Sequence, residues 1–314
     1  MKIEPLKRVN LITGQNNTGK TGVLEALTLL LDEPTPNQSL SGRLPNLFRT
    51  AGGDYENFWK WLFSNKSSDK TIEIKSSFND SDYFGVQLQA DQRPNEIRLN
   101  KKGQVVHPRM FGSVSCFTIG EKNGAGHKPA IFSTLPSNPT DDAVDYQRVI
   151  LKRRKKQVEK LLREIEPRLD AVEVLRIGDQ NHSQSLIYAD LALSEMIPVT
   201  QLGQGFNRLL RIYSEIMVAD AKVLLIDEIE NGLHHSVMPV IWKGLFLAAK
   251  EFDVQIFATT HSWECILAAD EAARVGETYD LALIRLDRVK EDIKATVIDE
   301  KSLSTAKELQ WEMR

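Results

Sequence analysis

The stretch VNLITGQNNTGKTGVLEALTLLL, residues 9–31, decides the fold of this 314-residue chain. Its apolar start predicts a strand, and the leucines after residue 20 recur at helical spacing. The segment between them, GQNNTGKT, matches G-x-x-x-x-G-K-[ST] in the strand–loop–helix context that this pattern requires. Such a loop turns successive backbone N–H groups and the helix N-terminus toward phosphate oxygens. We therefore predict a nucleotide-binding loop rather than an ordinary glycine-rich turn.

The residue types of this loop indicate how it would hold phosphate. Lys20 can reach the β- and γ-phosphates, and the Thr21 hydroxyl can bind Mg²⁺. The glycines allow the tight backbone path. The residues expected to contact the nucleotide are Gly14, Asn16, Asn17, Thr18, Gly19, Lys20, Thr21 and Gly22.

Three further apolar runs predict a sheet around this loop. They lie at residues 223–227, 254–260 and 281–286, and they are continuous rather than alternating, as in strands that are buried on both faces. Helical segments separate them, which is typical of βαβ units. We predict an α/β fold with a mainly parallel core sheet flanked by helices.

The remaining segments indicate smaller elements around this core. Residues 70–106 are short, half-polar runs joined by turns and predict an antiparallel β meander, while residues 112–139 resemble an irregular loop. Residues 141–169 predict one charged amphipathic helix, followed by a hairpin and a second amphipathic helix at LGQGFNRLLRIYSEIM. The expected parts are an N-terminal core (1–140), an inserted helical lobe with hairpin (141–200) and a C-terminal core (201–314).

Composition excludes several classes of protein. With 41% hydrophobic and 26% charged residues, the chain is not of a disordered or fibrous type. A net charge of −3 does not point to nucleic acid or membrane as a partner. Cys116 and Cys265 lack the spacing of a zinc cluster or disulfide framework. No apolar run is long enough to span a membrane, so we expect a cytoplasmic protein without a membrane partner.

Two acidic residues follow the apolar run VLLI. At the carboxyl end of such a strand, Asp227 can hold Mg²⁺ and Glu228 can polarise the attacking water. An ordinary exposed acidic pair is the alternative, but the adjoining apolar run favours a site. Glu230 and Asn231, which follow, are expected to be interface or turn residues.

Two further motifs are weaker by themselves. His261 follows the run VQIFATT, where ligands bind in open α/β sheets, and could contact the γ-phosphate and the lytic water, although a lone histidine is as often structural. Gly203, Gln204 and Gly205 open a helix and could form a second anion site or a simple cap. His234–His235 is expected to be a polar helix start.

Taken together, GQNNTGKT, LGQG, VLLIDEIENGLHH and ATTHS resemble, in order and rough spacing, the motifs of ATP-binding-cassette ATPases. GQNNTGKTGVLEAL and DEIENGLHH look most like the RecF, SMC and OLD group. The resemblance implies a Walker A loop at Gly14, Asn17, Gly19, Lys20 and Thr21, a metal and base pair at Asp227 and Glu228, a switch at His261 and a signature motif at residues 203–205. Leu202 stands where transporters have serine, and Gln87, Gln104 and Gln147 are candidates for the glutamine loop.

The resemblance also implies a function. In this family the signature of one protomer closes on the nucleotide of the other, so we expect ATP and Mg²⁺ as cofactors and a homodimer that forms on ATP binding. The leading hypothesis is an ATPase coupled to a DNA-related or anti-phage process with a separate effector, a nuclease or toxin. OLD-family nucleases continue into an acidic, metal-binding Toprim domain, and we expect this chain to have no nuclease activity of its own because it resembles their ATPase domain alone. The alternative is a slow regulatory module that binds or restrains such a partner.

DNA is a further expected partner, and the run KRRKK at residues 152–156 is the candidate contact. The same helix carries glutamates, so a solvated helix face is the simpler explanation of the run.

Overall fold

The computed structural model divides into two compact units, residues 1–24 with 128–314 and residues 25–127, and each is described by itself. The residues that the structure describes are 1–31, 71–78, 82–90, 98–99, 105–106, 109–111, 114–120, 130–132, 138–178, 183–276 and 278–308.

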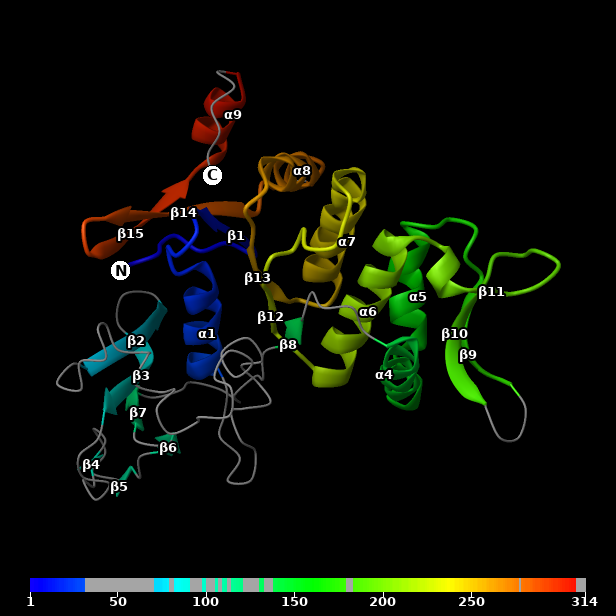
Figure 1. Cartoon of the computed structure of the whole chain (residues 1–314), viewed down its shortest axis with the longest axis horizontal. Coiled ribbons are helices and arrows are strands. Elements are labelled where there is room, and N and C mark those ends of the chain that lie inside the picture. The colour runs from blue at the N-terminus through cyan, green and yellow to red at the C-terminus, as the bar shows by residue number, and fades with distance from the viewer. Residues whose placement is uncertain are drawn as a thin grey trace. The chain divides into compact units, whose positions relative to one another are not determined.

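The first unit is built on a six-stranded sheet with the order β15-β14-β1-β13-β12-β8 (Figure 1). The strands from β14 to β8 run parallel, and β15 is antiparallel to β14 at one edge. Strands β1 and β12 are buried along their whole length, which confirms the predicted core sheet. The strand bounds are β1 (Val9–Gly14), β8 (Ala130–Phe132), β12 (Val223–Ile226), β13 (Gln255–Thr259), β14 (Leu281–Val289) and β15 (Asp292–Ile298).

Helices follow the strands as the βαβ pattern predicts. Among the described helices, none has the length and apolar character needed to cross a membrane. Cys265 is a free thiol in α8, and burial raises its pKa to about 12, so the thiol stays protonated. The helix bounds are α1 (Lys20–Leu31), α6 (Gln204–Ala219), α7 (Met238–Glu251), α8 (Trp263–Arg274) and α9 (Glu300–Glu308), with short 3₁₀ turns η4 (Val199–Gln201) and η5 (His235–Val237).

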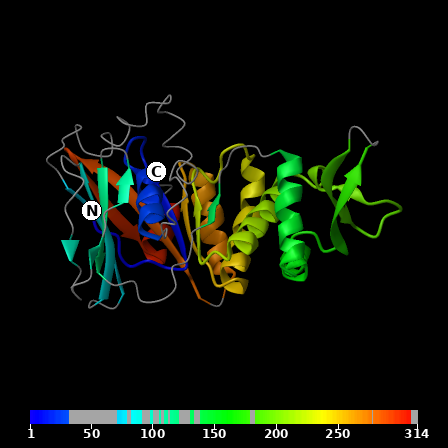
Figure 2. The same cartoon turned by 90° about the horizontal axis from the view of Figure 1, so that it is seen from below.

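A lobe of two helices and a small sheet lies beyond α6, on the side away from the core sheet (Figure 1). Figure 2 shows the hairpin of this lobe beyond α4 in a second view. The hairpin follows the sequence prediction, with β9 and β10 antiparallel. The elements are α4 (Pro139–Leu151), α5 (Lys155–Arg163), β9 (Ala171–Ile177), β10 (Gln184–Asp190) and β11 (Ile197–Pro198).

The prediction of a single helix over residues 141–169 is wrong, because the chain breaks between α4 and α5. Arg153 takes the left-handed conformation, with a φ of 58°. On either side of it, the side chains of Lys152 and Arg154 donate hydrogen bonds to backbone carbonyls near the end of α6. These tertiary contacts stabilise the break, and helical periodicity gives no sign of them.

The second unit contains two antiparallel sheets, of order β2-β3-β7-β6 and β4-β5. The predicted pairing of the first two runs is confirmed, but β3 next pairs with β7 rather than with β4. The prediction that residues 112–139 are irregular is therefore wrong for β7 and β8, since β7 pairs with the distant β3 as well as with the adjacent β6, and local composition does not reveal the distant partner. The bounds are β2 (Thr71–Phe78), β3 (Asp82–Ala90), β4 (Arg98–Leu99), β5 (Val105–Val106), β6 (Arg109–Phe111) and β7 (Val114–Gly120).

Helices α6 and α7 come close together at Gly244. The carbonyl of Gly244 accepts a hydrogen bond of 3.0 Å from the buried Tyr213 hydroxyl. A Cβ at residue 244 would lie 2.6 Å from both terminal methyl carbons of Leu209. The absence of a side chain therefore sets the spacing of the two helices.

We expect Gly244→Ala to lower the free energy of unfolding by about 1–3 kcal/mol, because the added methyl group overpacks this contact. Urea denaturation followed by circular dichroism measures the change. The matched control is Gly22→Ala in α1, where a Cβ would meet no atom within 4 Å. A Gly244→Ala protein as stable as the control would show that the helices separate without cost.

Candidate nucleotide site

The phosphate loop leaves β1 at a point where only glycine fits. Gly14 has a φ of 145°, and a Cβ there would lie 2.4 Å from the carbonyl oxygen of Leu286 in β14. Further along the loop, Asn17 and Gly19 have φ values of 61° and 84°. Left-handed residues at these positions bend the backbone into the concave path that phosphate loops need.

Lys20 lies inside this loop and is buried. Its Nζ donates hydrogen bonds to the carbonyl oxygens of Gly14 (2.8 Å) and Gln15 (2.9 Å). Burial lowers the pKa of Lys20, and nearby carboxylates oppose that change. Those carboxylates belong to Asp227, Glu228 and Glu230. The ammonium group is thus held where phosphate oxygens would meet the loop.

The other predicted loop residues divide by exposure. Asn16, Asn17, Gly19 and Gly22 are exposed. Thr18 is buried, and its hydroxyl donates a bond of 2.8 Å back to the carbonyl of residue 15. Its side chain therefore stabilises the loop, and its backbone is the part that could contact a ligand.

Two predicted metal ligands lie side by side. The Thr21 hydroxyl donates to the Asp227 carboxylate, with oxygen–oxygen distances of 3.0 and 3.2 Å. A hydroxyl and a carboxylate are hard oxygen donors of the kind that Mg²⁺ prefers, and Mg²⁺ completes its shell with water and phosphate oxygens. Among the described residues, no three acidic, histidine or cysteine side chains gather into a self-contained metal site. The pair therefore fits Mg²⁺ that arrives with a nucleotide.

Glu228 follows directly and takes a strained backbone conformation, with a φ of 47°. Its N–H donates a bond of 2.7 Å to the Thr259 hydroxyl, and its side chain is exposed. Asn231 donates from its amide to the Glu228 carboxylate at 3.5 Å. The turn thus directs the candidate base away from the sheet and toward solvent.

Sequence reasoning missed Thr259 as part of this site. Its hydroxyl donates to Asp227 at 2.6 Å while accepting from the backbone of Glu228, so one buried group positions both acidic residues. Part of the signal lies in the sequence, because β13 ends at Thr259 and Thr260 follows, but the pairing of β13 with β12 is known only from the structure. A hydroxyl at the carboxyl end of the adjacent strand is a natural partner for the carboxylate.

The structure brings His261 to the same edge of the sheet. Its backbone N–H donates a bond of 2.6 Å to Oε1 of Glu230, and the residue is half-buried. The other oxygen of Glu230 is buried and has no hydrogen-bond partner among the described residues. Glu230 therefore acts as a turn residue that holds the loop of His261 against the loop of Glu228.

The signature-like turn opens α6. Gly203 is exposed with a φ of 89°, and its carbonyl accepts a bond of 2.8 Å from the Asn207 amide. Gln204 is exposed, whereas Gly205 is buried at a place where a Cβ would lie 2.7 Å from Val237. Within the described part of the chain, no hydrogen bond or ion pair joins residues 203–205 to the phosphate loop.

The glutamine candidates lie elsewhere. Gln147 is exposed on α4, and the backbone of Gln87 lies in β3. Gln104 lies outside the described residues. For Gln87 and Cys116 the structure describes the backbone but not the side chain. The assignment of the glutamine loop stays a prediction.

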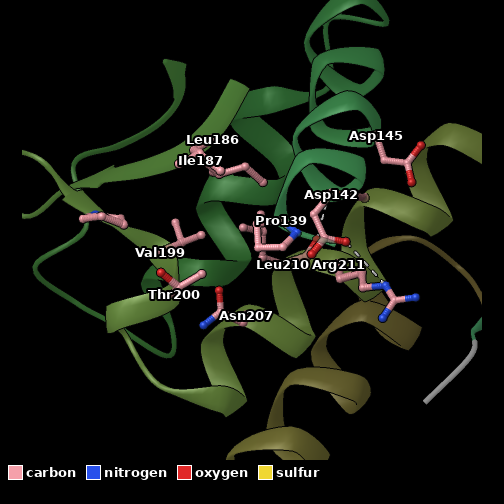
Figure 3. Close-up of a pocket in the computed structure, with 12 residues that line it drawn as sticks. Pro139, Asp142, Asp145, Leu186, Ile187, Val199, Thr200, Asn207, Leu210 and Arg211 are labelled. Atoms are coloured by element: carbon pink, nitrogen blue, oxygen red, sulfur yellow. Dashed lines mark hydrogen bonds and ion pairs between the residues drawn. The ribbon is translucent and has the colours of Figure 1, made fainter. Parts of the chain in front are cut away.

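A cavity of about 130 Å³ lies between α4, α6 and β10 (Figure 3). Its walls are mostly apolar, as at Leu186, and Asp142 and Arg211 form an ion pair at 3.6 Å on its rim. Asn207 and Thr200 line the same cavity. Because Asn207 also binds the carbonyl of Gly203, the cavity adjoins the signature-like turn.

Known proteins resemble the chain along most of its length. Residues 1–177 match the family described as "AAA domain", and residues 139–266 match the family "AAA domain, putative AbiEii toxin, Type IV TA system". An "ATP/GTP phosphatase" of Helicobacter pylori is 22% identical over 330 residues, which cover 87% of this chain and 84% of the relative.

Solved structures resemble the chain in fold. An SMC head, bound in its crystal to the C-winged helix domain of ScpA, is 13% identical with a TM-score of 0.52, covering 96% of this chain and 93% of that one. The SMC head domain from Thermotoga maritima is 14% identical with a TM-score of 0.49, covering 93% and 90%. The first of these shows that the fold is the ABC-type P-loop fold of an SMC head.

We expect Thr259→Val to lower the rate of ATP hydrolysis about 10–100-fold, because the isosteric side chain loses both hydrogen bonds to the acidic pair. Phosphate release over a range of Mg²⁺ concentrations measures the effect, which should be accompanied by a higher Mg²⁺ requirement. Thr259→Ser keeps the hydroxyl and serves as the control, with a rate near that of the unchanged protein. Equal rates for both variants would exclude this positioning role.

Proposed function

The chain belongs to the AAA domain family and is an ATPase, and we propose that ATP closes two copies of it into a homodimer that hydrolysis releases. The observation that carries the chemistry is the contact of Thr21, Asp227 and Thr259 beside Lys20. Bound Mg²⁺ would neutralise charge on the phosphates. Thr21 and Asp227 would hold it, Lys20 would bind phosphate oxygens and Glu228 would orient and deprotonate water.

The proposal of a dimer is supported by the turn at residues 203–205. The first turn of α6 leaves N–H groups without helical partners, and it is exposed at Gly203 and Gln204. Such N–H groups favour an anion. Since no hydrogen bond or ion pair of the described residues joins this turn to the phosphate loop of its own chain, we infer that a second copy supplies the nucleotide it meets.

The proposed process is DNA-related or anti-phage defence, with a separate effector, a nuclease or toxin. The family match that mentions the AbiEii toxin and type IV toxin–antitoxin systems supports this class of process. The H. pylori relative carries the name "ATP/GTP phosphatase", so GTP is a second candidate substrate. The slow regulatory module remains the competing function, and nucleotide trapping separates the two.

DNA is proposed as a further partner, through fewer residues than the sequence suggested. Lys152 and Arg154 form ion pairs with Asp220, and Lys155 pairs with Glu173. These cations are engaged within the protein. In the described part of the chain, Arg153 and Lys156 form no ion pair and would have to make the contact.

We expect Glu228→Gln to accumulate as an ATP-bound dimer, because the amide keeps the shape of the base but does not take up the proton of the attacking water. Light scattering with ATP and Mg²⁺, alongside phosphate release, measures both effects. A regulatory module would behave like the unchanged protein in both assays. A Glu228→Gln protein that stays monomeric at saturating ATP would contradict the proposed dimer.

Mixing two variants provides the control for shared sites. Lys20→Ala disables the phosphate loop, and Gln204→Glu places a negative charge at the signature-like turn without strain at a helix N-terminus. Each should be inactive alone. In a mixed dimer one site contains two intact halves, so the mixture should recover about a quarter of the normal rate. Without recovery, each site would lie within one chain.

We expect Arg153→Ala with Lys156→Ala to weaken binding of a short DNA duplex and to reduce the salt slope of the affinity by about 1 for each phosphate that the protein no longer neutralises. Fluorescence anisotropy between low and physiological salt measures this change. Lys152→Ala is the matched control, since Asp220 already engages that charge. If the unchanged protein shows no salt-dependent affinity for DNA, DNA is not a partner.

A further inference from the structure

The side chain of Arg288, near the C-terminal end of the sequence, lies at the phosphate loop. Strand β14 runs parallel to β1, with Gly14 opposite Leu286, and continues to Val289. Two residues past that pair, Nη2 of Arg288 donates a hydrogen bond of 2.8 Å to the carbonyl oxygen of Asn17. This bond uses one of the five N–H groups of the guanidinium, and the residue remains exposed.

The order of the strands puts Arg288 on a defined side of the loop. Strands β13 and β12 lie on one side of β1 and bring Thr259 and Asp227, while β14 lies on the other side. The proposed Mg²⁺ and the terminal phosphates belong to the side of Asp227. With its terminal phosphates on that side, the nucleoside end of the linear triphosphate would extend away from Asp227, toward β14.

We propose that Arg288 is a nucleotide-binding residue that stacks its guanidinium on the base of the bound purine nucleotide. This inference rests on the proposed ATP site at Lys20 and adds a contact to it. Guanidinium groups stack on aromatic faces, and a stacked contact is indifferent to the base's hydrogen-bonding edge. Adenine and guanine nucleotides would therefore gain equally from Arg288.

A neighbouring cation shows what distinguishes Arg288. Arg285 lies on the opposite face of β14, because side chains alternate along a strand. Its Nε is engaged by the carboxylate of Asp287 at 2.9 and 3.1 Å. No carboxylate contacts Arg288 among the described residues, so its charge and planar face are available to a ligand.

The test compares nucleotides with inorganic tripolyphosphate, which has the phosphate chain without the nucleoside. Arg288→Ala should weaken ATP and GTP binding about tenfold each, and leave tripolyphosphate binding unchanged. Arg285→Ala should change neither. Fluorescence of a labelled ATP analogue, with ATP, GTP or tripolyphosphate as competitors, measures the affinities.

Two outcomes would overturn the inference. Equal losses for ATP and tripolyphosphate would mean that Arg288 only braces the loop through Asn17, and no loss for either would mean that it does not act in binding. Lys20→Ala separates these failures from failure of the ATP site itself. That variant should lose affinity for all three ligands, and if it does not, the proposed site is wrong.

Discussion

The carboxylate of Asp227 is the constraint on which the site depends. It accepts hydrogen bonds from Thr21 at the start of α1 and from Thr259 at the end of β13, while it stands itself at the end of β12. Three elements that are distant in sequence thus meet at one group. A charged group shared by two hydroxyls is held more firmly than by either alone, because bonds to an ionised acceptor are strong. The hydrogen bond between Thr21 and Asp227 therefore fixes the position of the phosphate loop relative to β12.

Backbone strain lies close to this contact. Glu228 is left-handed without being glycine, and Asn17 in the phosphate loop is as well. Such residues cost about 1–3 kcal/mol each and persist when the surroundings determine them. At Glu228 the determining contact is the bond from its N–H to Thr259. The same threonine therefore holds the metal-binding carboxylate and maintains the turn that exposes the base.

The sequence predicts the parts of the fold that depend on local pattern. The phosphate loop, the buried strands and the helix after residue 203 each follow from periodicity or a motif, and the structure has them where they were expected. The break at Arg153 and the pairing of β3 with β7 depend on contacts between distant segments. Local composition carries no information about such contacts, so these two predictions failed.

The site divides in the same way. Lys20, Thr21 and Asp227 were predicted from motifs, and the structure brings them together. Thr259 and Arg288 were not singled out, because a threonine or an arginine is common and acquires meaning only from its neighbour in the sheet. The order of the strands places Thr259 beside Asp227 and Arg288 beside the phosphate loop. A motif therefore locates the phosphates, whereas the topology determines what surrounds them.

The turn at residues 203–205, exposed at Gly203 and Gln204, is connected to the acidic strand end through α6. Arg208, one turn into that helix, donates a bond of 3.0 Å to the carbonyl of Asn231, and burial lowers its pKa to about 10. Glu230, beside Asn231, accepts the N–H of His261. A second copy of the chain that contacts this turn would therefore affect the loop beyond Glu228 through the buried Arg208. In the proposed dimer, closure of two chains and alignment of the candidate base would occur together, because a packed arrangement of this kind shifts as a unit.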